Sequence, residues 1–276
     1  MAKFDNIIIV SDMDGTFLGS GSRIISQNMR AIEYFNQNGG RFTFNTGRGY
    51  TNVALRFPEV MCILSAPMGL HNGSCIYDTQ KDCAVEEIFI DNSAACEISK
   101  YLISLPSEIN FTLRTTRKFY AVNGQQHGHF QHFAIKFPQY SEIISFEYIK
   151  KLDVQKIFFE GEQEKINSIR QYIEATYSNY IQCTTGGTNY IEIDPIGSTK
   201  ARHIHRLKDI LGLPNAKIFA IGDYENDLEM LRAADFAVCP ENAMDMVKCV
   251  TDITVCHHDK GAIADLIRII EERYLG

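Results

Sequence analysis

The sequence predicts an α/β protein built on a doubly wound parallel sheet, with a separate α+β module inserted into it. Short aliphatic runs alternate with amphipathic helical stretches at the start of the chain, and the same alternation returns near its end. Between them, from about residue 85 to residue 187, the strands are alternating or aromatic instead. Continuously apolar strands are typical of a sheet covered on both faces, and such sheets place functional groups at the carboxyl ends of their strands.

The first βαβ unit lies at the start of the chain. Ile7 to Val10 is a short, fully apolar strand. Ser26 to Asn38 has apolar residues at helical spacing and ends before a Gly-Gly pair, and Phe42 to Asn45 returns to strand.

The same pattern near the end of the chain predicts five further elements. They are a helix from Ser198 to Ile210, a strand from Lys217 to Ile221, a helix from Glu225 to Ala234, a strand from Phe236 to Val238 and a helix from Lys260 to Tyr274.

The inserted module has a different pattern of helices and strands. Its expected elements are two amphipathic helices, Ser93 to Ser104 and Glu162 to Tyr177, and strands that include Phe111 to Leu113, Phe119 to Val122 and Val154 to Phe159. Turn-rich segments flank the module at residues 78–82 and 184–188. We therefore expect a core of residues 1–84 and 188–276, and an insert of residues 85–187.

The composition is that of a globular protein, and its net charge favours a small-molecule partner. The chain has 276 residues, of which 45% are hydrophobic, so it can bury a core, and disorder and collagen are excluded. Its 27 Lys and Arg against 34 Asp and Glu give a net charge of −7. This acidic balance argues against a general nucleic-acid binder and against a polybasic membrane-surface protein.

The cysteines and the N-terminus favour the cytoplasm. The eight cysteines include no Cys-x-x-Cys pair, and we expect them to be reduced thiols. The aliphatic run Ile7 to Val10 is well short of the roughly 7 to 15 apolar residues of a signal peptide and the roughly 18 of a membrane helix.

The first candidate catalytic group follows the first strand. Asp12 and Asp14 are two residues apart in a run that continues through Gly15 and Thr16. An Asp-Gly pair between apolar runs is also a common hairpin turn. At the end of a buried strand, however, one carboxylate can attack an electrophile while the other transfers protons, and the glycine lets the backbone turn sharply.

The second group follows the strand that ends at Ile221. Asp223, Glu225 and Asp227 fall within five residues. Acidic residues at a helix start also serve as caps and complement the helix dipole, but that accounts for one acid more readily than for three. Several oxygen ligands after a buried strand suit Mg²⁺.

Two further groups have the chemistry to hold a phosphoryl group. Thr46, Gly47 and Arg48 follow the second core strand, and Lys200 lies in the first turn of a helix. Taken singly, Thr-Gly is an ordinary turn and such a lysine is usually solvated. A hydroxyl with backbone N–H groups at a strand end, and an ammonium at a helix start, are also what phosphate binding needs.

In this order the motifs resemble the haloacid dehalogenase (HAD) superfamily of phosphatases, specifically its Cof-type subfamily with a large α/β (type IIB) cap. The family's motifs correspond here to Asp12 to Thr16, Thr46, Lys200 and Gly222 to Asp227. The Asn-Gly pair that this branch has after a third strand is Asn72 and Gly73. The resemblance spans nearly the whole chain and implies a Rossmann-like catalytic core, with the insert as a cap that sets substrate specificity.

The resemblance also implies a role for each residue. Asp12 would attack phosphorus and form an aspartyl-phosphate, and Asp14 would protonate the leaving alcohol and then activate water. Lys200 would neutralise phosphoryl charge. The implied cofactor is Mg²⁺, held by the Asp12 carboxylate, the Asp14 backbone carbonyl and Asp223, with Asp227 in its shell or holding Lys200. The other residues expected to bind phosphate or substrate are Gly15, Thr16, Thr46, Gly47, Arg48 and Asn226.

A basic stretch in the insert is the remaining candidate. Residues 109–141 contain no Asp or Glu but include Arg114, Arg117 and three histidines, His127, His129 and His132. These residues suit either a solvated basic strand face or a surface that attracts an anionic substrate. The histidines have no carboxylate or Cys nearby in sequence to complete a metal site.

The sequence therefore predicts a cytoplasmic, Mg²⁺-dependent phosphomonoesterase for a small phosphorylated metabolite, with sugar phosphates as the leading class. One alternative is a sugar phosphomutase, which needs a second phosphate site in the cap, with Arg114 and Arg117 as candidates. Another is a non-catalytic phosphometabolite-binding protein on the same scaffold. We expect no nucleic-acid or membrane partner, and the sequence leaves the oligomeric state open.

Overall fold

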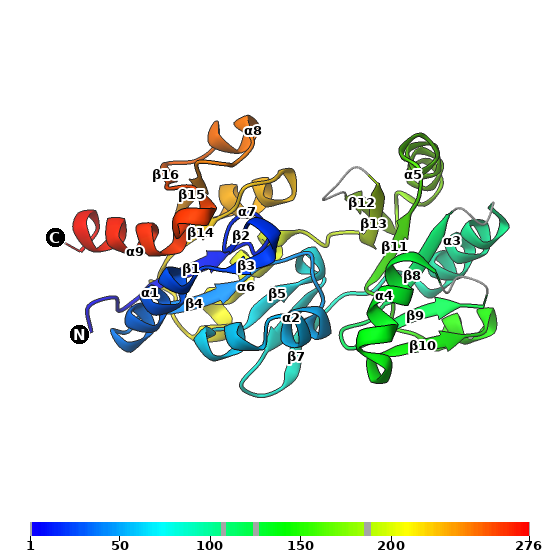
Figure 1. Cartoon of the computed structure of the whole chain (residues 1–276), viewed down its shortest axis with the longest axis horizontal. Helices are drawn as coiled ribbons and strands as arrows, with labels where there is room; N and C mark the ends of the chain where they lie inside the picture. The colour runs from blue at the N-terminus through cyan, green and yellow to red at the C-terminus, as the bar shows by residue number, and fades with distance from the viewer. Residues whose placement is uncertain (1, 106–108, 124–126, 185–188, 276) are drawn as a thin grey trace. The chain divides into compact units, whose positions relative to one another are not determined.

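The computed structural model of the chain describes residues 2–105, 109–123, 127–184 and 189–275. They divide into two compact units (Figure 1). The first unit, the core, comprises residues 1–47, 54–85 and 199–276; the second, the cap, comprises residues 48–53 and 86–198. The expected second boundary, at residue 187, lies outside the described residues, and the cap extends past it to Ser198.

The core is built on a five-stranded parallel sheet in the order β16-β15-β14-β1-β4. Its strands are β1 (Ile7–Ser11), β4 (Arg41–Phe44), β14 (Lys217–Ile221), β15 (Phe236–Pro240) and β16 (Ile253–Val255). Every residue of the central strand β1 is buried. The parallel α/β core predicted from the continuously apolar runs is thus confirmed.

Helices cover both faces of this sheet, which is why β1 has no polar face. Ile8 and Val10 pack into a cluster with Leu207 of α6 (Lys200–Leu211) and Met230 of α7 (Leu228–Ala233). The alternate residues of β1 point to the other face, where α1 (Ser26–Gln37) contacts α9 (Ala262–Arg273) (Figure 1). A short helix, α8 (Asp245–Lys248), follows β15.

Smaller elements surround the carboxyl ends of the core strands. β2 (Leu18–Gly19) and β3 (Arg23–Ile24) form a hairpin after β1. A three-stranded sheet contains β5 (Met68–Leu70), β6 (Cys75–Asp78) and β7 (Cys83–Glu87), and a bridge from Asn45 to Gly69 places β5 beside the end of β4. The chain leaves the core at Gly47 for the first part of α2 (Tyr50–Arg56).

The cap has a six-stranded sheet in the order β10-β9-β8-β11-β13-β12. Its strands are β8 (Asn110–Arg114), β9 (Phe119–Val122), β10 (Ser141–Ile144), β11 (Lys156–Glu160), β12 (Ile181–Thr184) and β13 (Tyr190–Pro195). β13 pairs with β11 and β12, and for this reason the cap continues beyond the limit expected from sequence.

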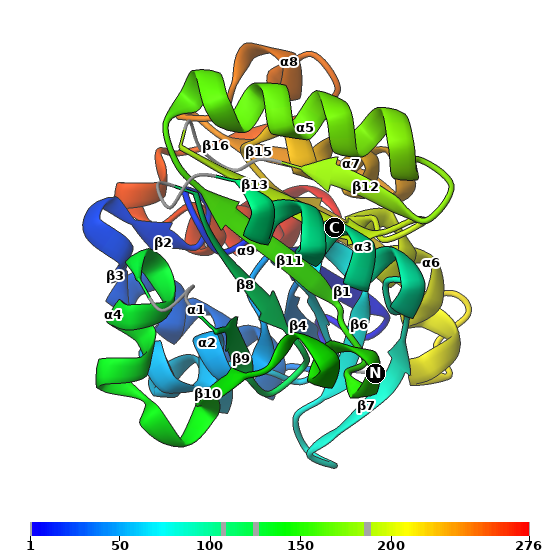
Figure 2. The same ribbon diagram turned by 90° about the vertical axis from the view of Figure 1, so that its right-hand side faces the viewer.

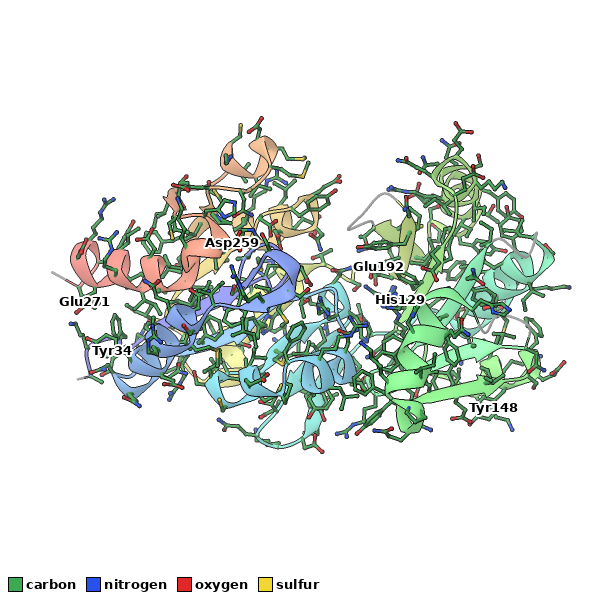
Figure 3. The ribbon with its side chains drawn as sticks, viewed as in Figure 1. Tyr34, His129, Tyr148, Glu192, Asp259 and Glu271 are labelled. Atoms are coloured by element: carbon green, nitrogen blue, oxygen red, sulfur yellow. The ribbon has the colours of Figure 1, made fainter. Side chains whose placement is uncertain are left out.

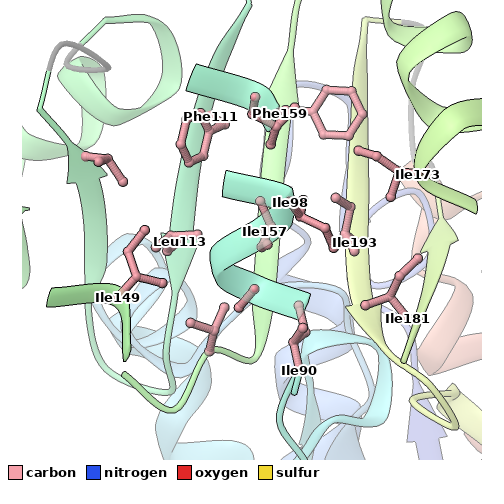
Figure 4. Packing of buried hydrophobic residues seen from close by; sticks show 14 of the residues in the cluster. Ile90, Ile98, Phe111, Leu113, Ile149, Ile157, Phe159, Ile173, Ile181 and Ile193 are labelled. Atoms are coloured by element: carbon pink, nitrogen blue, oxygen red, sulfur yellow. The ribbon is translucent and has the colours of Figure 1, made fainter. Parts of the chain in front are cut away.

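The apolar core of the cap lies on one face of its sheet. Ile98 of α3 (Asn92–Ser104) and Ile173 of α5 (Gln163–Tyr177) pack with Phe111, Ile157 and Ile193 of the strands (Figure 4). Figure 2 shows both helices in front of the strands of this sheet. The alternate strand residues face the other way. A helix that the sequence did not predict, α4 (Gly128–Lys136), carries His129 and His132, so this basic stretch is not the continuous strand face considered from sequence.

No helix among the described residues combines the length and apolar composition needed to cross a membrane.

Candidate active site

The loop that leaves β1 carries the first two carboxylates. The Asp12 N–H donates to the Ile221 carbonyl at 2.9 Å, so Asp12 continues the sheet ladder. Its side chain is almost buried, whereas that of Asp14 is exposed. Gly15 has a φ of +81°, and a Cβ there would overlap the Asp223 carboxylate. Only glycine therefore lets this loop pass so close to the loop after β14.

Lys200 joins two carboxylates from different strands. It is the first residue of α6, and its side chain is fully buried. Its Nζ donates to Asp12 Oδ1 and to Asp227 Oδ1, both at 2.6 Å. Burying an ammonium requires paired charges, and these two carboxylates supply them and keep the pKa of Lys200 above its usual value.

Asp227 holds the lysine and its own turn together. Its Oδ2 accepts from the backbone N–H groups of Asp223 and Tyr224, both at 3.0 Å, while Oδ1 accepts from Lys200. Both carboxylate oxygens of Asp227 are thus engaged. Of the two roles expected for this residue, holding Lys200 is the one with direct contacts in the structure.

Asp223 faces the same space. Its Oδ1 accepts from the Thr16 hydroxyl at 2.6 Å, and each of the carboxylates of Asp12, Asp223 and Asp227 offers an oxygen within 4.8 Å of the others. Burial raises the pKa of Asp223 to about 6. Burial, followed by the charges of Asp227, Asp223 and Asp14, raises the pKa of Asp12 well above its usual value, although Lys200 opposes this.

The three converging carboxylates fit a hard divalent cation. Their donors are all oxygen, as Mg²⁺ prefers, and the local negative charge exceeds the single positive charge of Lys200. A cation would offset both the burial and the mutual repulsion that raise the pKa values of Asp12 and Asp223.

Thr46 is fixed between two neighbouring segments. It is buried, its N–H donates to the Gly69 carbonyl at 2.9 Å, and its own carbonyl accepts from the Asn72 N–H at 3.1 Å. Gly47 ends this part of the core. Arg48 groups with the cap instead, and its guanidinium donates to Asn52 at 2.6 Å.

Two asparagines that the sequence reasoning did not assign connect these loops. Asn45 Nδ2 donates to the Lys200 carbonyl at 2.7 Å and so ties β4 to the start of α6. Asn242 Nδ2 donates to the Gly15 carbonyl at 2.8 Å. The position of Asn45 beside Thr46 was the one available signal, whereas Asn242 follows β15 without any motif.

The Asn-Gly turn lies against the acidic loop. Asn226 Nδ2 donates to Asn72 Oδ1 at 3.3 Å. His71 and Asn72 have φ values of 50° and 55°, and Gly73 has a φ of 94°. A positive φ is costly for His71 and Asn72, whereas Gly73 adopts it freely, and such strain is concentrated at functional sites.

In the cap, Arg114 and Arg117 contact different groups. The Arg114 guanidinium lies 4.3 Å from the centre of the Phe158 ring and 4.9 Å from that of Phe119. Among the described residues, its Nε and Nη2 are buried without a hydrogen-bond partner, and burial lowers its pKa to about 10. The Arg117 guanidinium lies 5.5 Å from the centre of the Tyr50 ring.

The histidines of the basic stretch do not assemble a metal site. The groups of potential ligands found among the described residues do not include His127, His129 or His132. His129 instead packs its ring 5.0 Å from that of Phe158.

Known proteins match this chain over nearly its whole length. The family model of haloacid dehalogenase-like hydrolases matches residues 9–267. Among curated proteins, the chain is 23% identical to the 5-amino-6-(5-phospho-D-ribitylamino)uracil phosphatase YitU of Bacillus subtilis, over 95% of this chain and 96% of that protein. It is 23% identical to the Escherichia coli phosphatase YbjI of the same description, over 94% of each chain.

Solved structures show the same fold. A haloacid dehalogenase-like hydrolase from Bacteroides thetaiotaomicron superposes with a TM-score of 0.82 at 22% identity, over 96% of this chain and 99% of that one. A structure described as a HAD subclass IIB sugar phosphatase superposes with a TM-score of 0.77 at 16% identity, over 98% of this chain and 100% of that one.

Proposed function

This chain belongs to the haloacid dehalogenase-like hydrolase family, and from that premise we propose that it is a phosphatase that acts through an aspartyl-phosphate at Asp12. The observation that carries the proposal is the buried contact of Lys200 with Asp12 and Asp227, beside Asp223. A nucleophilic carboxylate beside a fixed ammonium is the arrangement that transfer of a phosphoryl group requires.

The chain's own residues account for both halves of the reaction. Asp12 attacks phosphorus, the bond to the ester oxygen breaks, and Asp14 gives that oxygen a proton. Asp14 then takes a proton from water as the water attacks the aspartyl-phosphate, which releases phosphate and restores Asp12. The exposure of Asp14 suits this exchange of protons with a substrate and with water.

Lys200 and Thr46 bind the phosphoryl group in this proposal. The ammonium offsets the negative charge of the phosphoryl oxygens, which would otherwise repel the Asp12 carboxylate. Thr46 contributes its hydroxyl after β4, with the backbone of Gly47 next to it, and the Gly15 to Thr16 turn follows Asp12 directly in the loop after β1.

The cofactor we propose is Mg²⁺, held by the Asp12 carboxylate, the Asp14 backbone carbonyl and Asp223. When bound, it supplies positive charge to the phosphoryl oxygens and the transition state. The all-oxygen donor set supports this choice.

The substrate class we propose is a phosphorylated sugar or polyol. The names of the similar proteins support this: the curated relatives are described as acting on a phosphoribityl compound, and one structural neighbour is described as a sugar phosphatase. We further propose that the cap recognises the leaving group through the sheet face opposite α3 and α5, part of which α4 covers. That face carries Arg114 and the stacked rings of Phe158 and Tyr190, 5.1 Å apart.

One observation keeps the sugar phosphomutase as a second candidate. The unpartnered Nε and Nη2 of Arg114, counted among the described residues, could bind a second phosphate. A mutase would need a bisphosphate activator and would transfer phosphate without net release, whereas the phosphatase releases phosphate from a monophosphate. A non-catalytic binding protein is disfavoured, because Asp12, Asp14, Lys200 and Asp223 are all present.

Phosphate release from p-nitrophenyl phosphate tests the proposal. We expect activity with Mg²⁺, loss with EDTA and poor activity with Ca²⁺, whose more numerous and longer bonds would misplace Asp12. Asp12→Asn should abolish turnover, whereas Asp209→Asn, an exposed aspartate of α6, should behave as wild type. Full activity after exhaustive chelation would contradict the metal assignment, and full activity of Asp12→Asn would contradict the nucleophile.

A further inference from the structure

A second group of metal-binding side chains lies outside the proposed phosphatase site. His257, His258 and Asp259 follow β16, and a 3₁₀ turn over His258–Lys260 leads into α9. Asp259 is labelled in Figure 3, where it lies next to the β2–β3 hairpin. All three residues belong to the core, and neither histidine has a part in the proposed reaction.

The donor atoms of the three side chains converge. His257 Nδ1 lies 3.7 Å and His258 Nε2 3.8 Å from Asp259 Oδ2, and the three donors lie within 4.8 Å of one another. Two ligands at zinc's bond length of about 2.0 to 2.1 Å are roughly 3.4 Å apart in tetrahedral geometry. The carboxylate oxygen and each nitrogen therefore need to approach by only a few tenths of an ångström.

Hydrogen bonds already orient His258 toward this space. Its Nδ1 lies 2.7 Å from the Leu18 carbonyl, which can only accept, so Nδ1 carries the hydrogen and Nε2 carries the lone pair. A metal-bound histidine typically donates its other N–H to a carbonyl in this way. The ring is also largely buried, with an exposed side-chain fraction of 13%, which limits its freedom.

Hydrogen bonds also fix the position of the Asp259 carboxylate. Its Oδ1 accepts from the Ser20 N–H at 2.8 Å and its Oδ2 accepts from the Ser20 hydroxyl at 2.7 Å, while Arg23 contacts Oδ1 at 3.3 Å. His257 Nδ1 accepts a long hydrogen bond of 3.3 Å from the Asp259 N–H, a contact that a metal would replace.

We propose that His257, His258 and Asp259 bind Zn²⁺ through two imidazole nitrogens and one carboxylate oxygen. Nitrogen donors favour zinc, whereas Mg²⁺ favours the all-oxygen group of Asp12, Asp223 and Asp227. Water supplies the remaining position, as in zinc sites with three protein ligands.

The bound ion would stabilise a particular junction of the core. Asp259 connects to the β2–β3 hairpin through Ser20, and His258 connects to Leu18 of the same hairpin. In addition, the His258 N–H donates to Asn242 Oδ1 at 3.0 Å, and Asn242 Nδ2 donates to the Gly15 carbonyl. Zinc would thus fasten the start of α9 to the hairpin and to the loop that carries Asp12.

Calorimetric titration of the full chain with Zn²⁺ in excess Mg²⁺ tests the proposal. We expect one Zn²⁺ per chain in the wild type and in Asp223→Asn, which alters the carboxylate group of the phosphatase site. His257→Ala and His258→Ala should each weaken binding at least tenfold. His205→Ala, an exposed histidine of α6, is the matched control and should bind as wild type.

Substitution of Co²⁺ for Zn²⁺ supplies a readout that needs no variant and no activity. The wild type should show the intense visible absorption of tetrahedral Co²⁺ with nitrogen ligands, and His257→Ala should lose it. Absence of this absorption in the wild type would overturn the proposal, as would equal Zn²⁺ affinity in the wild type and His257→Ala. Because neither measurement uses phosphate release, failure of the phosphatase proposal would leave both results interpretable.

Discussion

Lys200 determines the electrostatics of the proposed site at the scale of single residues. One buried ammonium contacts two carboxylates that come from the ends of two different strands. Its place depends on Asn45, whose Nδ2 donates to the carbonyl of the same lysine. Asn45 does not contact the reacting groups in this arrangement and acts as a positioning residue.

Substitution of Asn45 should therefore lower kcat more than it changes KM. Asn45→Ala loses one hydrogen bond worth about 0.5 to 1.5 kcal/mol, which corresponds to a loss of up to roughly tenfold in kcat. Asn45→Asp should lose more, because it keeps the size of the side chain but places a charged oxygen against the Lys200 carbonyl. Steady-state kinetics with p-nitrophenyl phosphate would measure both, and wild-type kcat in Asn45→Asp would remove Asn45 from the positioning of Lys200.

His203 gives the core a pH-dependent stability. Its Nε2 lies 2.9 Å from the Pro67 carbonyl, and burial lowers its pKa from 6.5 to about 4. The unfolded chain takes up a proton below pH 6.5, while the folded core takes it up only near pH 4. The contribution of neutral His203 is thus complete above pH 6.5 and is lost as the pH falls toward 4.

Across that interval the free energy of unfolding should fall by about 3 kcal/mol because of this residue. Urea denaturation at a series of pH values would measure the slope. His203→Gln keeps a donor for the Pro67 carbonyl and should remove this part of the slope. An unchanged slope in His203→Gln would show that other groups cause it.

At the scale of elements, the cap sheet contains a buried ion-pair cluster. Lys156 of β11 contacts Glu192 and, at 3.4 Å, Asp194, both of β13, and the side chains of Lys156 and Asp194 are fully buried. This cluster occupies the face opposite to the apolar core, where strand alternation places it.

Lys156→Met should destabilise the cap by about 3 to 5 kcal/mol, because it removes the lysine charge that pairs with the buried Asp194 and the partly buried Glu192. Lys118→Met is the matched control: its pair with Glu142 is exposed on both sides and is worth about 0 to 1 kcal/mol. Equal denaturation midpoints for the two variants would contradict the electrostatic account of this sheet.

The elements that could be predicted from sequence are those with an unambiguous period. β14 has the bounds expected from its apolar run, and α1, α3 and α5 end within one residue of expectation. β13 was missed because its alternation follows a Gly-Gly segment that suggested a boundary. α4 was missed because it is short, begins with Gly128 and is rich in aromatic residues, which are typical of strands.

Some of the site residues could likewise be placed from the sequence, and others could not. Asp12, Asp223, Asp227 and Lys200 could be placed together because strand ends of a parallel sheet meet at one edge. The grouping of Arg48 with the cap could not be predicted, because it depends on tertiary contacts such as that of the Thr51 hydroxyl with the Arg117 carbonyl at 2.6 Å.

At the scale of the whole molecule, the proposed function assigns the chemistry to the core and the substrate selectivity to the cap. Replacing residues 86–198 with a short linker should leave a core that still hydrolyses p-nitrophenyl phosphate weakly, because the carboxylates and Lys200 all lie in the core. The ranking of phosphorylated metabolites by kcat/KM should flatten, since the cap would read the leaving group. An unchanged ranking in the capless chain would remove the cap from substrate selection.

The central claim is that the phosphoryl group is transferred first to Asp12 and then to water. Rapid acid quenching of Asp14→Asn tests this claim most directly. This variant keeps the nucleophile and the backbone carbonyl at position 14 but lacks the group that activates water. With p-nitrophenyl phosphate we predict a burst of about one p-nitrophenol per chain followed by slow turnover. Peptide mass spectrometry of the quenched protein should find the phosphoryl group on Asp12. Turnover without a burst, or a phosphoryl group on another residue, would contradict the account.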